Sequence, residues 1–231
     1  SNNIRDHDLD ELWQLFFEST PDSEFGYIDG IKTSEESIFG PPPTINNISE
    51  VNILFYDFNS ENIRGYFAGN DQLCDDNNYN CSNIIYVNAD NQLQSDLDRS
   101  AFTLAHEYQH LLHWNIDPYE GNYITNTGEW YLSSPWLNEG LSDLASDILG
   151  LGQRDFSPYL ANTYLSLDEW PLPSENVSNI DAYYAKSALF FKYLFDYFDQ
   201  DGETIINLIF SDDQFQGLES IQSNLSLFDL E

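Results

Sequence analysis

The chain has 231 residues and a formal net charge of −33 at pH 7. So large a negative charge repels phosphate backbones and anionic lipid, which argues against nucleic-acid and membrane partners. Hydrophobic residues make up 41% of the chain, too many for a disordered acidic tail, yet they form no run long enough to span a membrane. The first residue is Ser1 and not Met, so we expect a processed product or a fragment whose signal peptide has already been removed.

The predicted elements change from strands to helices along the chain. A short apolar helix is expected over residues 9–17, followed by the rigid connection Pro41-Pro42-Pro43. Strands are expected over 51–58, 63–68 and 84–88. Helices are expected over about 98–114, 135–150 (with Ser134 as N-cap), 180–199, 203–210 and 216–229. Strands first and helices afterwards are typical of an α+β fold.

The two cysteines, Cys74 and Cys81, bracket most of an oxygen-rich segment. A pair at this spacing, with no other cysteine, predicts a small disulfide-closed loop in an oxidising compartment. The segment could also bind Ca²⁺ through its oxygen atoms, although the spacing of an EF-hand loop is absent. Its members are Asp71, Asp75, Asp76, Asn77, Asn78 and Asn80.

The expected helix over 98–114 contains an HExxH motif, His106-Glu107-Tyr108-Gln109-His110. Positions i and i+4 lie on one helical face, so His106 and His110 can reach a single metal ion. Glu107 is offset round the helix, where a carboxylate can hold a water molecule next to the metal. The alternative is that the histidines are buried and only satisfy local hydrogen bonds.

The next expected helix supplies a third ligand. Glu139 follows His110 by 29 residues, and two histidines with one glutamate form an established zinc-binding set. Asp143, one turn after Glu139, could accept the outer ring N–H of a liganding histidine.

HEYQH followed by NEGLSD resembles the active-site motifs of the gluzincin metallopeptidases. Further segments resemble the hyicolysin-type family of secreted bacterial peptidases within that group: GYFAGND (65–71), NIIYVNAD (83–90), LAHEYQHLLHW (104–114), WLNEGLSDLASD (136–147) and YYAKSALFFKYL (183–194). The resemblance covers roughly residues 50–215. It implies a zincin-like fold in which a mixed β-sheet and the HExxH helix (1–115) are followed by a mainly helical subdomain (116–231), with the cleft between them.

The resemblance also implies the roles of the site residues. His106, His110 and Glu139 would bind one catalytic Zn²⁺, Glu107 would activate the zinc-bound water, and Asp143 would support His106. The implied protein is a secreted, monomeric bacterial endopeptidase acting on protein or peptide substrates.

An oxyanion donor is also needed, and the two remaining histidines, His7 and His113, are badly placed to supply it. Tyr184 is the candidate, because Tyr184-Ala185-Lys186-Ser187 resembles the Tyr-x-Lys-Gly stretch of gluzincin aminopeptidases; Tyr183 is the alternative. The resemblance to zincins further implies that residues 63–68 form a sheet edge beside the cleft, where an extended peptide would bind.

Two other functions remain open. A catalytically silent relative could serve as a binding or adhesion module, although intact Glu107, Glu139 and Asp143 argue against this. A gluzincin aminopeptidase would need an acidic anchor for the substrate amine, and no GxMEN-like segment occurs in the chain.

Overall fold

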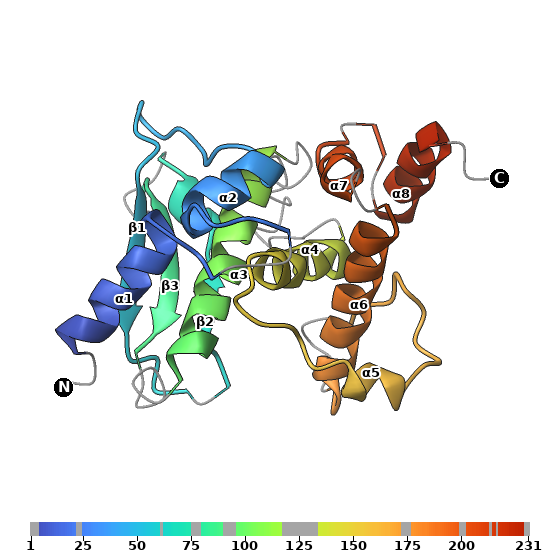
Figure 1. The fold of residues 1–231 in the computed structure, drawn as a ribbon, viewed down its shortest axis with the longest axis horizontal. Helices are drawn as coiled ribbons and strands as arrows, with labels where there is room; N and C mark the ends of the chain where they lie inside the picture. The colour runs from blue at the N-terminus through green and yellow to red at the C-terminus, as the bar shows by residue number, and fades with distance from the viewer. Residues whose placement is uncertain are drawn as a thin grey trace. The chain divides into compact units, whose positions relative to one another are not determined.

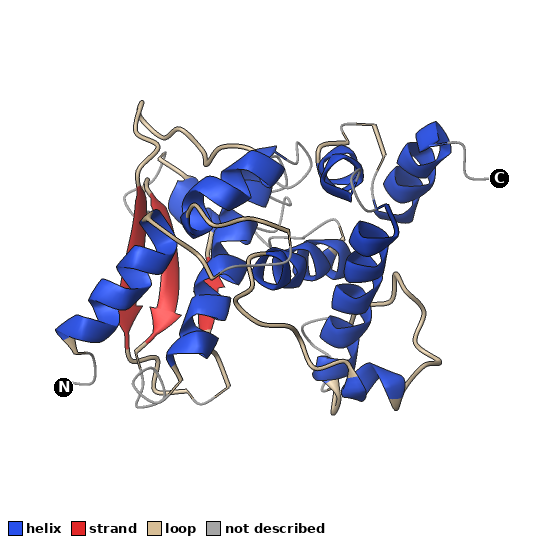
Figure 2. Ribbon diagram, viewed as in Figure 1, coloured by secondary structure: helices blue, strands red, loops and turns tan. Residues whose placement is uncertain are grey.

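The computed structural model describes residues 5–21, 25–60, 62–74, 80–89, 96–116, 134–171, 177–198, 202–212, 214–215 and 217–228. The described chain contains both helices and a small mixed sheet, so the predicted α+β class is confirmed (Figure 2). It forms two compact units. The first comprises Ser1–Asn115 and Ala145–Gln153, and the second comprises Ile116–Leu144 and Arg154–Glu231.

The sheet of the first unit has three strands in the order β1-β3-β2. β1 (Val51–Tyr56) pairs in parallel with β3 (Asn83–Asn88), and β2 (Gly65–Phe67) pairs antiparallel with the other side of β3. The ends of the three strands lie within two residues of the predicted ends. Among the described strands, β2 is therefore an edge strand, as the sequence predicted.

Asn88, at the end of β3, determines how the chain reaches β2. Its buried side-chain amide donates hydrogen bonds to the carbonyl oxygens of Ser60 (2.9 Å) and Ile63 (2.8 Å), and its carbonyl oxygen accepts one from the Phe58 N–H (3.1 Å). One side chain thus satisfies several backbone groups of the connection, which fixes the start of β2.

Three helices accompany this sheet in the first unit: α1 (Asp6–Phe17), α2 (Gly30–Phe39) and α3 (Leu97–Ile116) (Figure 1). The Tyr108 ring of α3 lies edge-on to Phe16 of α1, with ring centroids 5.0 Å apart. The Tyr108 hydroxyl donates a 2.6 Å hydrogen bond to Glu36 of α2. Since Phe16 and Tyr108 are fully buried, the N-terminal helices form part of the core of the first unit.

The described regular structure of the second unit is helical. α4 (Pro135–Ile148) begins in this unit, and its last turn belongs to the first. α5 (Ser157–Leu160), α6 (Ile180–Phe198), α7 (Gly202–Phe210) and α8 (Gly217–Leu225) follow, with contacts between successive members of this series. Gly140 lets α4 approach α6 closely, because a Cβ atom there would lie 2.5 Å from the Phe191 ring.

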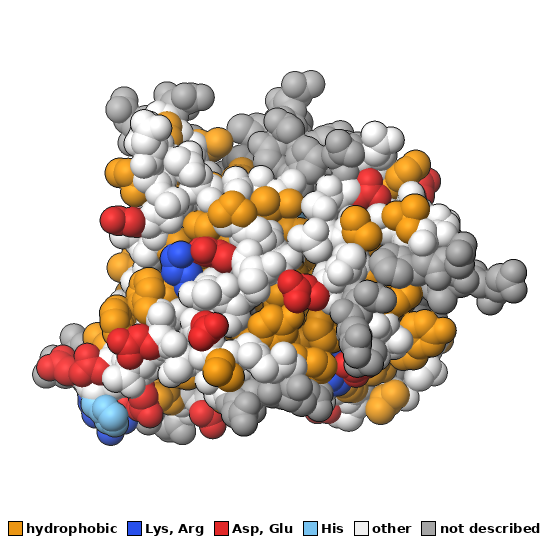
Figure 3. All heavy atoms as spheres, turned by 45° about the horizontal axis from the view of Figure 1, so that its top comes forward, with side chains coloured by type: hydrophobic (Ala, Val, Ile, Leu, Met, Phe, Trp, Pro, Cys, Tyr) orange, Lys and Arg blue, Asp and Glu red, His pale blue; other side chains and the backbone are white. Residues whose placement is uncertain are grey.

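Exposed carboxylates on one face of the molecule do not form a single patch. The face in Figure 3 carries Asp and Glu side chains scattered among polar and hydrophobic ones, not gathered into one block. Each helix in the described part of the chain is too short or too polar to cross a lipid bilayer.

Candidate metal centre

α3 carries both histidines of the HExxH motif on one face. Their Nε2 atoms are 3.1 Å apart, and the rings are nearly perpendicular, at 87°. The ring of Phe102, one turn earlier, stacks on His106 with centroids 6.2 Å apart. The i, i+4 spacing has therefore brought two imidazole nitrogens to one point, as the sequence predicted.

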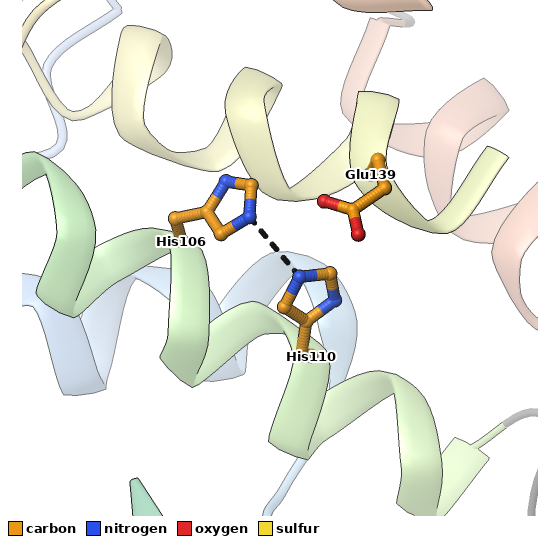
Figure 4. A group of neighbouring side chains, drawn as sticks. All are labelled: His106, His110 and Glu139. Atoms are coloured by element: carbon orange, nitrogen blue, oxygen red, sulfur yellow. Dashed lines mark hydrogen bonds between the residues drawn. The ribbon is translucent and has the colours of Figure 1, made fainter. Parts of the chain in front are cut away.

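Glu139 of α4 joins the two histidines. One ligand atom from each of His106, His110 and Glu139 lies within 4.8 Å of the others, and Figure 4 shows the Glu139 carboxylate directed toward both imidazole rings. The Ser146 hydroxyl, two turns after Glu139, donates a 2.9 Å hydrogen bond to the Phe102 carbonyl oxygen. This bond ties the end of α4 to α3 in the first unit.

This set of atoms suits a divalent metal such as zinc. Two imidazole nitrogens bound tetrahedrally at 2.0–2.1 Å from zinc would be about 3.3 Å apart, close to the separation observed here. The carboxylate adds the negative charge that a cation requires. The three residues therefore form a group that could hold a metal ion.

Glu107 is buried and lies against the edge strand. A Cβ atom on Gly65 of β2 would lie 2.9 Å from Glu107 Cγ and 2.6 Å from Thr103 Cγ2, so only glycine permits this approach. Thr103 and Glu107 are one turn apart and share the α3 face that meets β2. The candidate base is therefore held next to the backbone of the strand predicted to bind substrate.

Asp143 pairs with an arginine that the motif analysis did not identify. The Nε and Nη2 atoms of Arg154 donate hydrogen bonds of 2.6 and 2.7 Å to the two carboxylate oxygens of Asp143. Burial lowers the pKa of Arg154, but Asp143 and smaller contributions from Tyr184 and Glu139 outweigh it and raise the pKa above its usual value. No sequence motif surrounds Arg154, so only the fold could reveal this pair.

Tyr183 and Tyr184 are both half-buried on α6, but their surroundings differ. The Tyr183 hydroxyl lies 3.4 Å from a carboxylate oxygen of Glu169. The Tyr184 ring lies under the Arg154 guanidinium, with the carbon atom of that group 4.8 Å from the ring centroid. Tyr184 is therefore the tyrosine associated with the arginine that pairs with α4.

The predicted disulfide between Cys74 and Cys81 is confirmed. Asp71, three residues before Cys74, accepts hydrogen bonds from the Asn80 amide (2.6 Å) and the Tyr86 hydroxyl (2.5 Å). Burial, followed by the bond to Asp71, raises the pKa of Tyr86 to about 12. The other four members of the predicted calcium segment lie outside the described residues.

A buried carboxyl group of α2, Glu35, interacts electrostatically with His106. Glu35 is fully buried, and neither of its oxygen atoms has a hydrogen-bond partner among the described residues. Burial raises its pKa well above the usual value; the charge of His106 opposes the rise and that of Glu36 adds to it. No sequence signal pointed to Glu35.

No family model matches this sequence, and no curated protein was found to be significantly similar to it. The site must therefore be interpreted from its own residues.

Proposed function

We propose that this chain is a zinc-dependent endopeptidase that hydrolyses peptide bonds. The observation that carries the proposal is the convergence of His106, His110 and Glu139, with Glu107 on the same helix as the histidines. Two histidines and a glutamate leave one position of a tetrahedral zinc ion open, as catalytic sites require and structural sites do not.

Each residue then has a role. His106, His110 and Glu139 would hold the zinc ion, which would supply Lewis-acid chemistry and a better water nucleophile near neutral pH. Glu107 accepts a proton from the attacking water and returns it to the leaving amine. The close contact with Gly65 limits the conformations of the Glu107 side chain, which favours a fixed orientation toward the substrate.

The developing negative charge on the carbonyl oxygen needs a hydrogen-bond donor. We assign this role to Tyr184 in preference to Tyr183, because the Tyr183 hydroxyl interacts with Glu169 while Tyr184 lies against Arg154. Gly140 also supports the assignment. It brings α4, next to Glu139, against Ser187 and Phe191 on the helix that carries Tyr184.

An extended peptide would bind along β2. This strand lies at the edge of the described sheet and touches Glu107 through Gly65. Main-chain hydrogen bonds to an edge strand hold a peptide with little dependence on its sequence, which suits an endopeptidase. The Cys74–Cys81 disulfide further supports an oxidising compartment, as expected for a secreted enzyme.

The proposal is tested with two peptides of the same sequence, one with a free amino terminus and one acetylated. We expect cleavage of both at internal bonds, loss of activity in chelator and recovery on adding zinc. Cleavage of the free peptide alone would indicate an aminopeptidase. A protein that binds zinc and cleaves neither peptide, nor casein, would indicate a binding module.

His7→Ala is the matched control for histidine substitutions at the site. The His7 side chain is 77% exposed and belongs to α1, so its removal should change neither zinc binding nor cleavage. His106→Ala should abolish both. Equal behaviour of these two variants would contradict the proposal.

A further inference from the structure

Arg154 contacts two residues that come from different helices of the second unit. Its guanidinium donates two hydrogen bonds to Asp143 of α4, and the same group lies over the Tyr184 ring of α6. A planar guanidinium can do both, because its N–H groups point outward in the plane while its face remains available to an aromatic ring. Lysine could not reproduce this arrangement.

The end of α4 returns the chain to this position. Gly150 adopts a positive φ of 71°, and the Leu151 N–H donates a 3.0 Å hydrogen bond to the Ser146 carbonyl oxygen. This is the bond pattern of a glycine-terminated helix, and it reverses the chain direction. Arg154 follows three residues later, which brings it back to Asp143.

Tyr184 also contacts a loop that α6 itself holds in place. The Trp170 ring lies edge-on to Tyr184, with centroids 5.1 Å apart. Lys186 is buried, and its ammonium group donates hydrogen bonds to the carbonyl oxygens of Ser166 and Glu169, just before Trp170. The Tyr184 ring therefore has a cation on its face and a second aromatic ring fixed against it, so its orientation is determined from two directions.

We infer that Arg154 is a positioning residue for Tyr184: held by Asp143, it fixes the phenol ring so that the hydroxyl can donate to the oxyanion of the reaction. This inference rests on the proposed function. The positive charge also favours a hydrogen bond from the phenol to a negatively charged oxygen. Arg154 thus links α4, which carries Glu139, to the donor on α6.

A double-mutant cycle tests this role. Removing one oxyanion donor lowers kcat about 100-fold or more, so we expect that loss for Tyr184→Phe, and about 10- to 100-fold for Arg154→Met. If Arg154 acts through Tyr184, the double variant should be no slower than Tyr184→Phe by more than about 3-fold. KM should change little in all three variants.

Arg5→Met is the matched control. Arg5 makes the same two-bond pairing with Asp8 of α1, through its Nε (2.9 Å) and Nη2 (2.6 Å) atoms. The Arg5→Met variant should leave kcat unchanged within about 2-fold, since Arg5 lies outside the proposed site. Circular dichroism and zinc content check that each variant folds. If Arg154→Met fails to fold, Arg154→Lys takes its place in the cycle. This variant keeps the positive charge opposite Asp143 but lacks the planar guanidinium group.

A second readout does not depend on turnover. A phosphonamidate peptide carries negative oxygens that mimic the oxyanion, whereas a hydroxamate peptide binds the metal without mimicking it. We expect Arg154→Met and Tyr184→Phe each to weaken phosphonamidate binding about 10-fold or more, non-additively, with little effect on the hydroxamate.

The outcomes separate the two proposals. Three results would overturn the positioning role. They are losses of kcat that multiply in the double variant, a large rise in KM for Arg154→Met, and phosphonamidate affinity that is independent of Tyr184. A non-additive cycle in phosphonamidate affinity, together with a wild-type protein that cleaves no peptide, would support the positioning role and overturn the peptidase function alone.

Discussion

Two groups of polar side chains in this molecule resemble metal sites in the sequence, and the structure arranges them in opposite ways. At His106, His110 and Glu139, atoms that act as metal ligands face one another within 4.8 Å. At Asp71, the two carboxylate oxygens face hydrogen-bond donors, the Asn80 amide and the Tyr86 hydroxyl. The first group is suited to a cation, whereas the negative charge of Asp71 already has donors from the protein.

The comparison shows that residue composition alone does not distinguish a metal site from a hydrogen-bond network. The deciding feature is whether the lone pairs converge on one point or are matched by N–H and O–H groups. Glu35 is a third case, because its buried oxygens have no hydrogen-bond donor in the part of the chain that the structure describes. Four predictions test these differences.

The largest effect is expected at the converging group. Zinc at about 1,000 times its Kd should stabilise the wild-type protein by about 4 kcal/mol, which raises Tm by roughly 8–16 °C for a chain of this size. His110→Ala should abolish this zinc-dependent rise, while Asp71→Asn should retain it. Differential scanning calorimetry measures both. Equal zinc responses in the two variants would remove the distinction between the groups.

The second effect concerns Asp143, a buried carboxylate of the second unit that is paired with Arg154. Arg154→Met would leave the charge of Asp143, which is 2% exposed, without that partner. We expect a loss of roughly 3 kcal/mol in the free energy of unfolding, the lower end of the usual range because the Arg154 side chain is 25% exposed. Urea denaturation measures it, and a loss below about 1 kcal/mol would mean that Asp143 does not depend on Arg154.

A smaller loss is expected at Asp71. Tyr86→Phe removes one of the two donors to this carboxylate and should cost about 1–2 kcal/mol in the free energy of unfolding. Zinc binding should be unaffected. A variant that loses zinc instead would show that the two groups are coupled.

The last prediction has the opposite sign. The pKa of Glu35 is raised, so the metal-free folded protein holds this proton more tightly than the unfolded chain, whose glutamates ionise near pH 4.3. Its contribution to stability is therefore fully present below pH 4.3 and is lost as the pH rises toward the raised pKa. Glu35→Gln, which cannot ionise, should have a higher Tm than the wild type at pH 7–8 and no such advantage at pH 4.

Thermal unfolding in chelator measures this difference, with Glu219→Gln, an exposed glutamate of α8, as the control. Parallel pH profiles for the wild type and Glu35→Gln would show that Glu35 is not held in its protonated form.

Motif spacing and local patterns predicted much of the fold and the ligands of the candidate site. The i, i+4 histidines needed only helix geometry, and the three strands followed from β-branched and aromatic runs between turn residues. α2 was missed because its buried positions, Ile31, Ile38 and Phe39, are separated by the polar Ser34 and Glu35, which break the apolar stripe.

The environment of the site was harder to predict than its ligands. Asp143 was expected to support His106, and that role stays a prediction. Gly150 marks the end of α4, but local sequence does not show that the chain then brings Arg154 back to Asp143. Glu35 lies 71 residues before His106, and only tertiary packing brings the two close enough to affect each other's charge. Contacts between distant segments of this kind cannot be inferred from local sequence.

The most direct measurement of the central proposal compares the wild type with Glu107→Gln for both zinc content and casein hydrolysis. The proposed chemistry predicts one zinc ion per chain in both proteins, and a loss of hydrolysis of about 10²- to 10⁴-fold in the variant. Hydrolysis that survives Glu107→Gln, or a wild-type protein that binds no zinc, would contradict it.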